Sequence, residues 1–95
     1  MRVRISSPAY RDLANISDYL GARNLDAARR VGDRISRAIH LLGRSPYIGR
    51  RSGIADTRQY PVAGLPYLII YRLAGDIVEV LKVFHTSRNP DDRGM

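Results

Sequence analysis

The sequence contains no cysteine, which excludes a disulfide framework and any metal site built from thiolates. Its two histidines, His40 and His85, have no cluster of His, Asp or Glu around them, so neither a metal site nor a bound cofactor is expected. No apolar run approaches the length of a membrane span. The first residues, Met-Arg-Val-Arg-Ile, lack the hydrophobic core of a secretory signal, and we therefore expect a cytoplasmic protein.

Positive charge, by contrast, is abundant. The 95 residues carry a net charge of +7, and fifteen of the sixteen basic residues are arginine. This balance suits an acidic partner, either nucleic acid or an acidic protein segment, although a solvated basic surface would give the same composition. Residues 1–95 are expected to form one domain, long enough to bury roughly 60–65% of the unfolded surface. Residues 86–95 have no apolar period and are predicted to be a loose tail.

A β-hairpin is the strongest structural signal in the chain. Two runs rich in β-branched and aromatic residues, residues 67–73 and 77–85, flank a turn that contains Gly75. A two-residue loop at Ala74 and Gly75 would pair Leu73 with Asp76. One face would then carry Tyr67, Ile69, Tyr71, Val78, Val80, Lys82 and Phe84, and the other Leu68, Ile70, Arg72, Ile77, Glu79, Leu81, Val83 and His85. Both faces are largely apolar, so one should pack on helices and the other should be covered either by more of this chain or by a partner.

Two helices are predicted before the hairpin. Ser7 as N-cap and Pro8 in the first turn begin a helix that ends near Leu20, with Gly21 as its C-cap. The second helix begins after an N-cap at Asn24, and its arginines lie opposite an apolar stripe. A glycine within it, Gly32, suggests close packing at that point. The short connection between the helices predicts an antiparallel helical hairpin.

The remaining segments complete a predicted order of β-α-α-β-β-β. Residues 2–5 alternate polar and apolar and predict a short strand. Ser45-Pro46 ends the second helix, residues 46–56 are predicted to be a loop, and residues 57–62 form a strand that Pro61 confines to an edge. This order predicts an α+β domain, in which a mainly antiparallel sheet carries the helical hairpin on one face.

Five features occur in a fixed order along nearly the whole chain. They are the helix opening at residues 24–30, Pro46-x-x-Gly49-Arg50, Arg58, the run at residues 66–72 and the run at residues 76–85. In this order they resemble the RelE/ParE superfamily, the toxins of bacterial type II toxin–antitoxin systems. The resemblance implies a toxin that a cognate antitoxin, ParD-like or similar, neutralises in a hetero-oligomer. The antitoxin's C-terminal segment would wrap the toxin, and DNA contact would come mainly through the antitoxin.

The superfamily has two main functional branches. RelE-like members are ribosome-dependent endoribonucleases that cut mRNA, whereas ParE-like members bind and poison DNA gyrase without being nucleases. RelE-like nucleases carry an arginine in a Tyr-Arg-Leu-Val-Tyr strand, and here that position is Leu68. A lysine pair of some nucleases would fall near Gln59 and Pro61. These departures favour a gyrase inhibitor with no catalytic residues of its own. A basic binding module that has lost toxicity is a third interpretation.

The resemblance also suggests particular functional residues. If the protein is a ribonuclease, the catalytic candidates are His85, Arg58 and Arg88. If it is a gyrase inhibitor, His85 and Arg88 become candidate target contacts. Arg72 and His85 share a face in the predicted register, but about 26 Å of strand separates them, which is too far for one catalytic site. Arg72 is better explained as a partner of Glu79 or of another protein.

The face that carries Leu68 is expected to be the open one. The resemblance implies that the antitoxin's segment covers it, and the predicted antitoxin-binding residues are Leu68, Ile70, Arg72, Leu81 and Val83. Each large apolar side chain that becomes fully buried there would contribute about 1.5–3 kcal/mol. The excess of arginine suits an acidic antitoxin segment.

Overall fold

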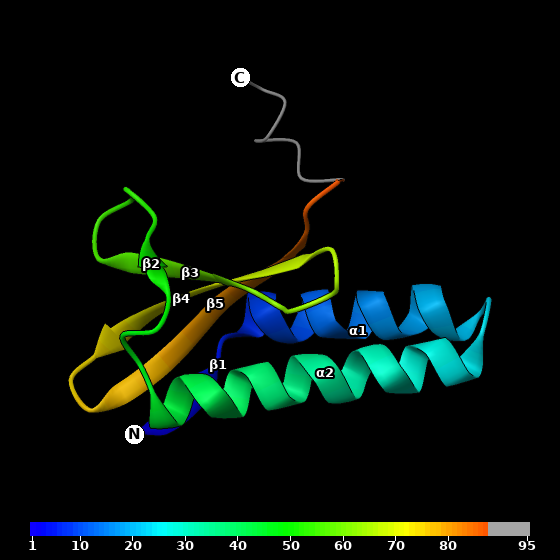
Figure 1. Cartoon of the computed structure of the whole chain (residues 1–95), viewed down its shortest axis with the longest axis horizontal. Helices are drawn as coiled ribbons and strands as arrows, with labels where there is room; N and C mark the ends of the chain where they lie inside the picture. Colours follow the sequence, from blue (N-terminus) through cyan, green and yellow to red (C-terminus); the bar gives the residue numbers. More distant parts are fainter. Residues whose placement is uncertain (88–95) are drawn as a thin grey trace.

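The computed structural model describes residues 1–87, which form a five-stranded sheet with two antiparallel helices on one face (Figure 1). The elements are β1 (Arg2–Ile5), α1 (Ser7–Gly21), α2 (Leu25–Arg44), β2 (Arg50–Arg51), β3 (Thr57–Pro61), β4 (Tyr67–Ala74) and β5 (Ile77–His85). The strand order is β1-β5-β4-β3-β2, with β1 parallel to β5 and every other pair antiparallel. The predicted α+β architecture is confirmed. Only β2, whose two residues are too few to show alternation, was predicted as loop.

Capping side chains set where both helices begin. The N-cap of α1 is Ser6, one residue before the predicted cap, and its Oγ accepts a hydrogen bond from the Ala9 N–H at 3.2 Å. The Ser6 N–H donates to Val80 O at 3.0 Å, and its hydroxyl donates to Leu81 O at 3.1 Å. Ser6 therefore ends the pairing of β1 with β5 and starts α1. Asn24 caps α2 as predicted, accepting from the Ala27 N–H at 3.0 Å.

An acidic side chain fastens α1 across the last strand. β1 ends at Ile5, so the edge of β5 beyond Val80 has no strand beside it. The Asp12 carboxylate fills this place, accepting from the Val83 N–H at 2.8 Å and from Lys82 Nζ at 3.1 Å. The helical layer is thereby held to the sheet by hydrogen bonds as well as by apolar packing.

The β4–β5 hairpin differs from the prediction at two points. Its loop is Gly75-Asp76, with Ala74 paired with Ile77, and Gly75 has the positive φ of 64° that a type II′ turn requires at its first position. Leu73 therefore pairs with Val78, two residues later in β5 than predicted, and a shift by two leaves the two faces of the hairpin unchanged. The second difference is a β-bulge at Leu81, because Ile70 pairs with Lys82 whereas Tyr71 pairs with Val80.

The bulge reverses the faces of all later residues in β5. Val83 lies opposite Ile69 and is only 4% exposed in the hydrophobic core, and His85 lies opposite Tyr67 on the same side. Lys82 and Phe84 move to the opposite face. The predictions that Val83 and His85 share the face of Leu68 are therefore wrong, because one extra residue inverts the alternation that follows it.

The core lies between the sheet and the helices. It consists of Ala9, Ile35, Ala38, Ile39, Leu42, Val62, Tyr67, Ile69, Tyr71, Val78, Val80 and Val83. Residues 88–95, with Arg88 and most of the predicted tail, lie outside the described residues. Thr86, the first residue of that tail, donates its N–H to Pro66 O at 2.8 Å and is thus tied to the sheet.

Candidate functional site

The open sheet face is the side of the sheet that faces away from both helices (Figure 1). Alternation along β4 places Leu68, Ile70 and Arg72 on it, since Ile69 and Tyr71 between them are buried. Leu68 lies between Phe84 and Pro61 on the neighbouring strands. The open sheet face is therefore apolar around Leu68.

The other end of the open sheet face is ionic. The Glu79 carboxylate accepts from Arg72 Nε at 2.9 Å and from Arg4 Nη2 at 3.3 Å, across three neighbouring strands. The Arg72 guanidinium holds the pKa of Glu79 below its ordinary value. Arg72 is therefore engaged in a cross-strand ion pair, as the sequence suggested, rather than aimed at an empty anion site.

Arg58 lies on the opposite, helix-facing side of the sheet, since it pairs with the buried Tyr71. Its Nη1 donates to Gly49 O at 2.7 Å, and its guanidinium lies 5.2 Å from the centroid of the Tyr47 ring. The Tyr71 hydroxyl donates to Pro46 O and accepts from the Gly49 N–H, both at 2.8 Å. Burial raises the pKa of this phenol. Arg58 and Tyr71 together hold the segment that joins α2 to β2.

This arrangement explains the glycine in the Pro46-x-x-Gly49 motif. A Cβ at Gly49 would lie 2.5 Å from the Tyr71 hydroxyl oxygen and 2.9 Å from Gln59 O. Only glycine lets the chain pass this close to the buried phenol. The motif therefore has a packing role that is independent of any catalysis.

His85 contacts Tyr67, with ring centroids 5.2 Å apart and ring planes nearly perpendicular. Its Nδ1 accepts from the Ser87 N–H at 3.2 Å. The strand partners of His85 and Arg58 are Tyr67 and Tyr71, which are four residues, or about 13 Å, apart along β4. The two candidate catalytic residues within residues 1–87 are therefore not brought together, and Arg88 falls outside that range.

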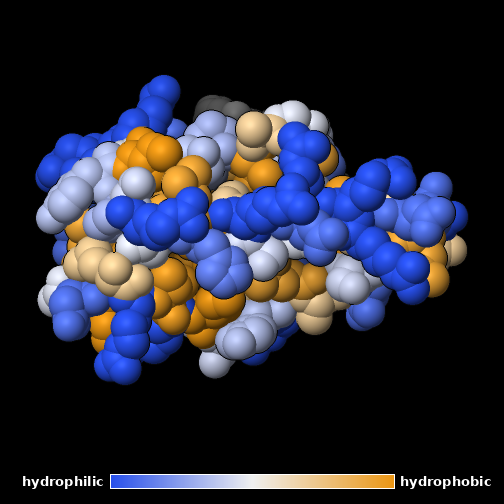
Figure 2. Space-filling model, turned by 60° about the horizontal axis from the view of Figure 1, so that its bottom comes forward, coloured by the Kyte–Doolittle hydropathy of each residue, from blue (hydrophilic) through white to orange (hydrophobic). Residues whose placement is uncertain are grey.

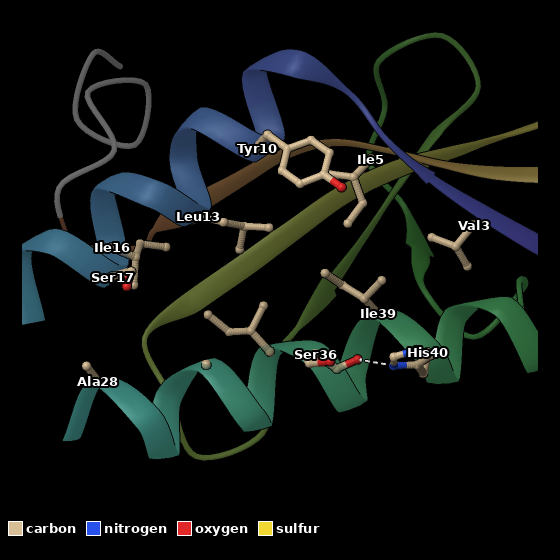
Figure 3. Close-up of a pocket in the computed structure, with 12 residues that line it drawn as sticks. Val3, Ile5, Tyr10, Leu13, Ile16, Ser17, Ala28, Ser36, Ile39 and His40 are labelled. Atoms are coloured by element: carbon tan, nitrogen blue, oxygen red, sulfur yellow. Dashed lines mark hydrogen bonds between the residues drawn. The ribbon is translucent and has the colours of Figure 1, made fainter. Parts of the chain in front are cut away.

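A second apolar surface, the helical groove, lies between α1 and α2 with β1 at its end (Figure 3). Its volume is about 430 Å³. Leu13 and Ile16 of α1 face Ile39 of α2 across it. Figure 2, in which the helical layer is turned toward the viewer, shows apolar side chains exposed beside a band of hydrophilic ones. The sequence predicts the apolar stripe of each helix, but periodicity does not show that the two stripes leave a gap.

Gly32 lies on the wall of this groove. A Cβ at Gly32 would meet no atom within 4 Å, so the predicted close packing there is wrong. The glycine instead widens the groove by one missing side chain. His40 lies at the rim, where its ring Nδ1 is 2.9 Å from Ser36 O.

Within residues 1–87, no group of three His, Cys, Asp or Glu side chains is placed to hold a metal ion. None of the helices in this part of the chain is long and apolar enough to span a membrane.

Comparisons with known proteins agree with this structure. Residues 3–90 match the family model described as ParE toxin of type II toxin-antitoxin system, parDE. The chain is 40% identical to the putative toxin Y4kP of Sinorhizobium fredii, over 92% of this chain and 90% of that protein. It is 34% identical to toxin RelE2 of Caulobacter vibrioides, over 84% of this chain and 89% of that protein.

Two solved structures share the fold. The chromosomal ParDE system from P. aeruginosa gives a TM-score of 0.80 at 19% identity and covers 90% of this chain and 95% of that one. The isolated E. coli RelE toxin gives 0.68 at 15% identity and covers 98% and 92%. The family match and the curated relatives confirm the resemblance seen in the sequence motifs, and the chain belongs to the ParE toxin family of type II toxin–antitoxin systems.

Proposed function

We propose that this toxin arrests growth by binding and poisoning DNA gyrase, without a catalytic group of its own. The observation that supports this most is the environment of Leu68, which takes the place of the arginine of RelE-like nucleases. Its neighbours across the sheet are Phe84 and Pro61. Cleavage of RNA needs donors or cations aimed at the phosphate as charge develops on it, and the immediate surroundings of Leu68 offer apolar contact instead.

The positions of the alternative catalytic residues also favour a toxin without a catalytic group of its own. Arg58 donates a hydrogen bond to Gly49 O, and His85 packs against Tyr67. The strand partners of these two residues are about 13 Å apart along β4. Both lie on the helix-facing side of the sheet, away from Leu68. His85 and Arg88 remain the proposed target contacts. A ribosome-dependent endoribonuclease is the second candidate, and the relatives named RelE in Caulobacter vibrioides favour it.

We also propose that a cognate antitoxin, ParD-like or similar, neutralises the toxin in a cytoplasmic hetero-oligomer that contacts DNA mainly through the antitoxin. On the open sheet face, its C-terminal segment would cover Leu68, Ile70, Leu81 and Arg72. Val83 is not a contact in this proposal, since it is buried in the core. The helical groove is a second apolar surface of a size that suits side chains of an amphipathic segment.

Two assays on one preparation of purified toxin, freed of antitoxin, would test the proposal. Supercoiling and cleavage-complex formation by gyrase would be measured in one, and mRNA cleavage on translating ribosomes in the other. We expect gyrase inhibition with intact mRNA, and reversal when antitoxin is added back. Cleaved mRNA together with unaffected gyrase would refute the proposal and turn attention to His85 as a catalyst.

A further inference from the structure

The segment between α2 and β3 exposes three large apolar side chains. Tyr47 is 69% exposed, Ile48 45% and Ile54 71%. Between them, Arg50 and Arg51 form β2 at the edge of the sheet, and both are exposed. We call residues 47–54 the β2 arm. In Figure 1 the β2 arm and the start of β3 stand at the end of the sheet farthest from β1.

The backbone beneath Tyr47 and Ile48 is fixed on both sides. Pro46 O and the Gly49 N–H are both bonded to the buried Tyr71 hydroxyl at 2.8 Å, and Arg58 holds Gly49 O at 2.7 Å. The side chains between these two anchors are left in solvent rather than in the core. The Arg58 guanidinium lies over the Tyr47 ring and restricts it further.

The tip of the β2 arm is fixed in the same way. Ile54 O accepts from the Thr57 N–H at 3.0 Å and from the Thr57 hydroxyl at 2.8 Å, while the Ile54 N–H donates to Ser52 Oγ at 3.2 Å. The Ser52 and Thr57 hydroxyls are also hydrogen-bonded to each other. Ile54 is therefore an exposed apolar side chain on an immobilised backbone, which lowers the entropy lost when such a side chain binds.

We propose that the β2 arm is a surface with which the toxin docks on its protein target, in addition to the proposed contacts at His85 and Arg88, and that it fits an apolar pocket bordered by carboxylates. The inference rests on the proposed function, in which the target is a protein. An exposed tyrosine beside two arginines has the composition of interface hot spots, and the arginines select an acidic rim. The two isoleucines argue against single-stranded nucleic acid, whose bases stack on aromatic rings. The arm shares no residue with the proposed antitoxin surfaces.

The test uses two arm variants and two matched controls. The arm variants are the double substitution Tyr47→Ala, Ile54→Asp and the double substitution Arg50→Ala, Arg51→Ala. The controls are Leu25→Asp, at a side chain 58% exposed at the start of α2, and Arg29→Ala, Arg30→Ala on its exposed face. Each full-length toxin is assayed for growth arrest, gyrase inhibition, antitoxin affinity and melting temperature.

We expect the arm variants to need about 30-fold or more toxin for half-inhibition, since truncating two interface anchors has at least that effect. Antitoxin affinity and melting temperature should match wild type, and the controls should behave as wild type in every assay. Arm variants that inhibit gyrase and growth at the wild-type concentration would overturn the inference while leaving the proposed function intact. Arm variants that lose growth arrest when wild-type toxin spares gyrase would support the inference and refute gyrase as the target.

Two further outcomes overturn the inference. If the arm variants lose antitoxin affinity in parallel with toxicity, the β2 arm belongs to the antitoxin's interface. If wild-type toxin binds a fluorescent RNA or DNA oligonucleotide in a salt-sensitive manner and the arm variants do not, the arm is a nucleic-acid surface.

Discussion

The two ends of α2 are packed in opposite ways, and three glycines measure the difference. Near its C-terminal end, a Cβ at Gly43 would lie 2.9 Å from Val3 Cγ2, and just beyond the helix a Cβ at Gly49 would lie 2.5 Å from the Tyr71 hydroxyl oxygen. In the N-terminal half, a Cβ at Gly32 would meet nothing within 4 Å. The helical layer is filled to contact distance at Gly43 and Gly49 and is open at Gly32.

The contrast bears on the proposal that a partner fills the helical groove. Protein interiors are close-packed, so the space beside Gly32 is a surface groove and not part of the core. The closed end holds the β2 arm in one conformation, whereas the open end keeps a groove of about 430 Å³ between apolar side chains. The predictions below test this contrast, beginning with the closed end.

The largest effect is expected for Gly49→Ala. The added methyl group would press on the Tyr71 hydroxyl and on Gln59 O, and the hydrogen bond from the Gly49 N–H would be lost or weakened. Overpacking and a buried unsatisfied group together should lower the free energy of unfolding by about 3–4 kcal/mol. Urea denaturation would measure it. A loss below about 0.5 kcal/mol, the range of surface substitutions, would show that the closed end is looser than described.

At the open end, Gly32→Leu should block binding rather than folding. The new side chain would project into the helical groove and compete with the proposed antitoxin segment, so affinity should fall about 100-fold, or roughly 2.7 kcal/mol. Isothermal titration with the cognate antitoxin would measure this, with Leu68→Glu tested beside it on the open sheet face. Unchanged affinity for Gly32→Leu combined with a loss for Leu68→Glu would assign the antitoxin to the sheet alone.

Tyr71→Phe should destabilise the closed end by about 2 kcal/mol. The substitution removes the hydroxyl that bonds Pro46 O and the Gly49 N–H, leaving two polar groups without this partner while the ring stays in place. Thermal and urea unfolding would give the value. A neutral substitution would mean that water replaces the phenol as the partner of both groups.

Gly32→Ala should have the opposite sign from Gly49→Ala. An exposed mid-helix glycine lowers stability by up to about 1 kcal/mol relative to alanine, and the structure leaves room for the methyl group. We expect a small rise in melting temperature. A fall would contradict the open groove, since it would reveal a contact at Gly32.

The smallest effect is expected in how the melting temperature depends on pH. Arg72 lowers the pKa of Glu79 in the folded protein below the ordinary value of 4.5. The ionised Glu79 therefore stabilises the folded state above pH 4.5, and this stabilisation is lost as the pH falls through the lowered pKa. The melting temperature of Glu79→Gln should therefore decrease less on acidification than that of wild type. Parallel pH profiles would show that the Arg4–Glu79–Arg72 row does not favour the folded state.

The sequence predicted the elements well because caps and alternation are local signals. Asn24, the strand at residues 2–5 and the buried row through Val80 all followed from them. The faces of Val83 and His85 did not, since the bulge at Leu81 inverts the alternation after it and no residue type in β5 marks its position.

The candidate surfaces were predictable only in part. The alternation in β4 placed Leu68 and Ile70 on the open sheet face, and Arg72 with Glu79 beside them. The helical groove was missed because periodicity shows which side of a helix is apolar but not how much of that side a neighbour covers. The sequence predicts only a loop with two arginines at the β2 arm, since the exposure of Tyr47 depends on Tyr71 and Arg58, which are distant in the sequence.

The parallel pairing of β1 with β5 has a consequence for synthesis. Arg2 pairs with Ile77 and Ile5 with Val80, so β1 cannot pair until β5 has been synthesised. While the chain is still emerging from the ribosome, the sheet has no neighbour for β1, and the sites that Asp12 occupies on β5 do not yet exist. Such long-range contacts form late in folding. The sheet is therefore completed only after β5 has left the ribosome.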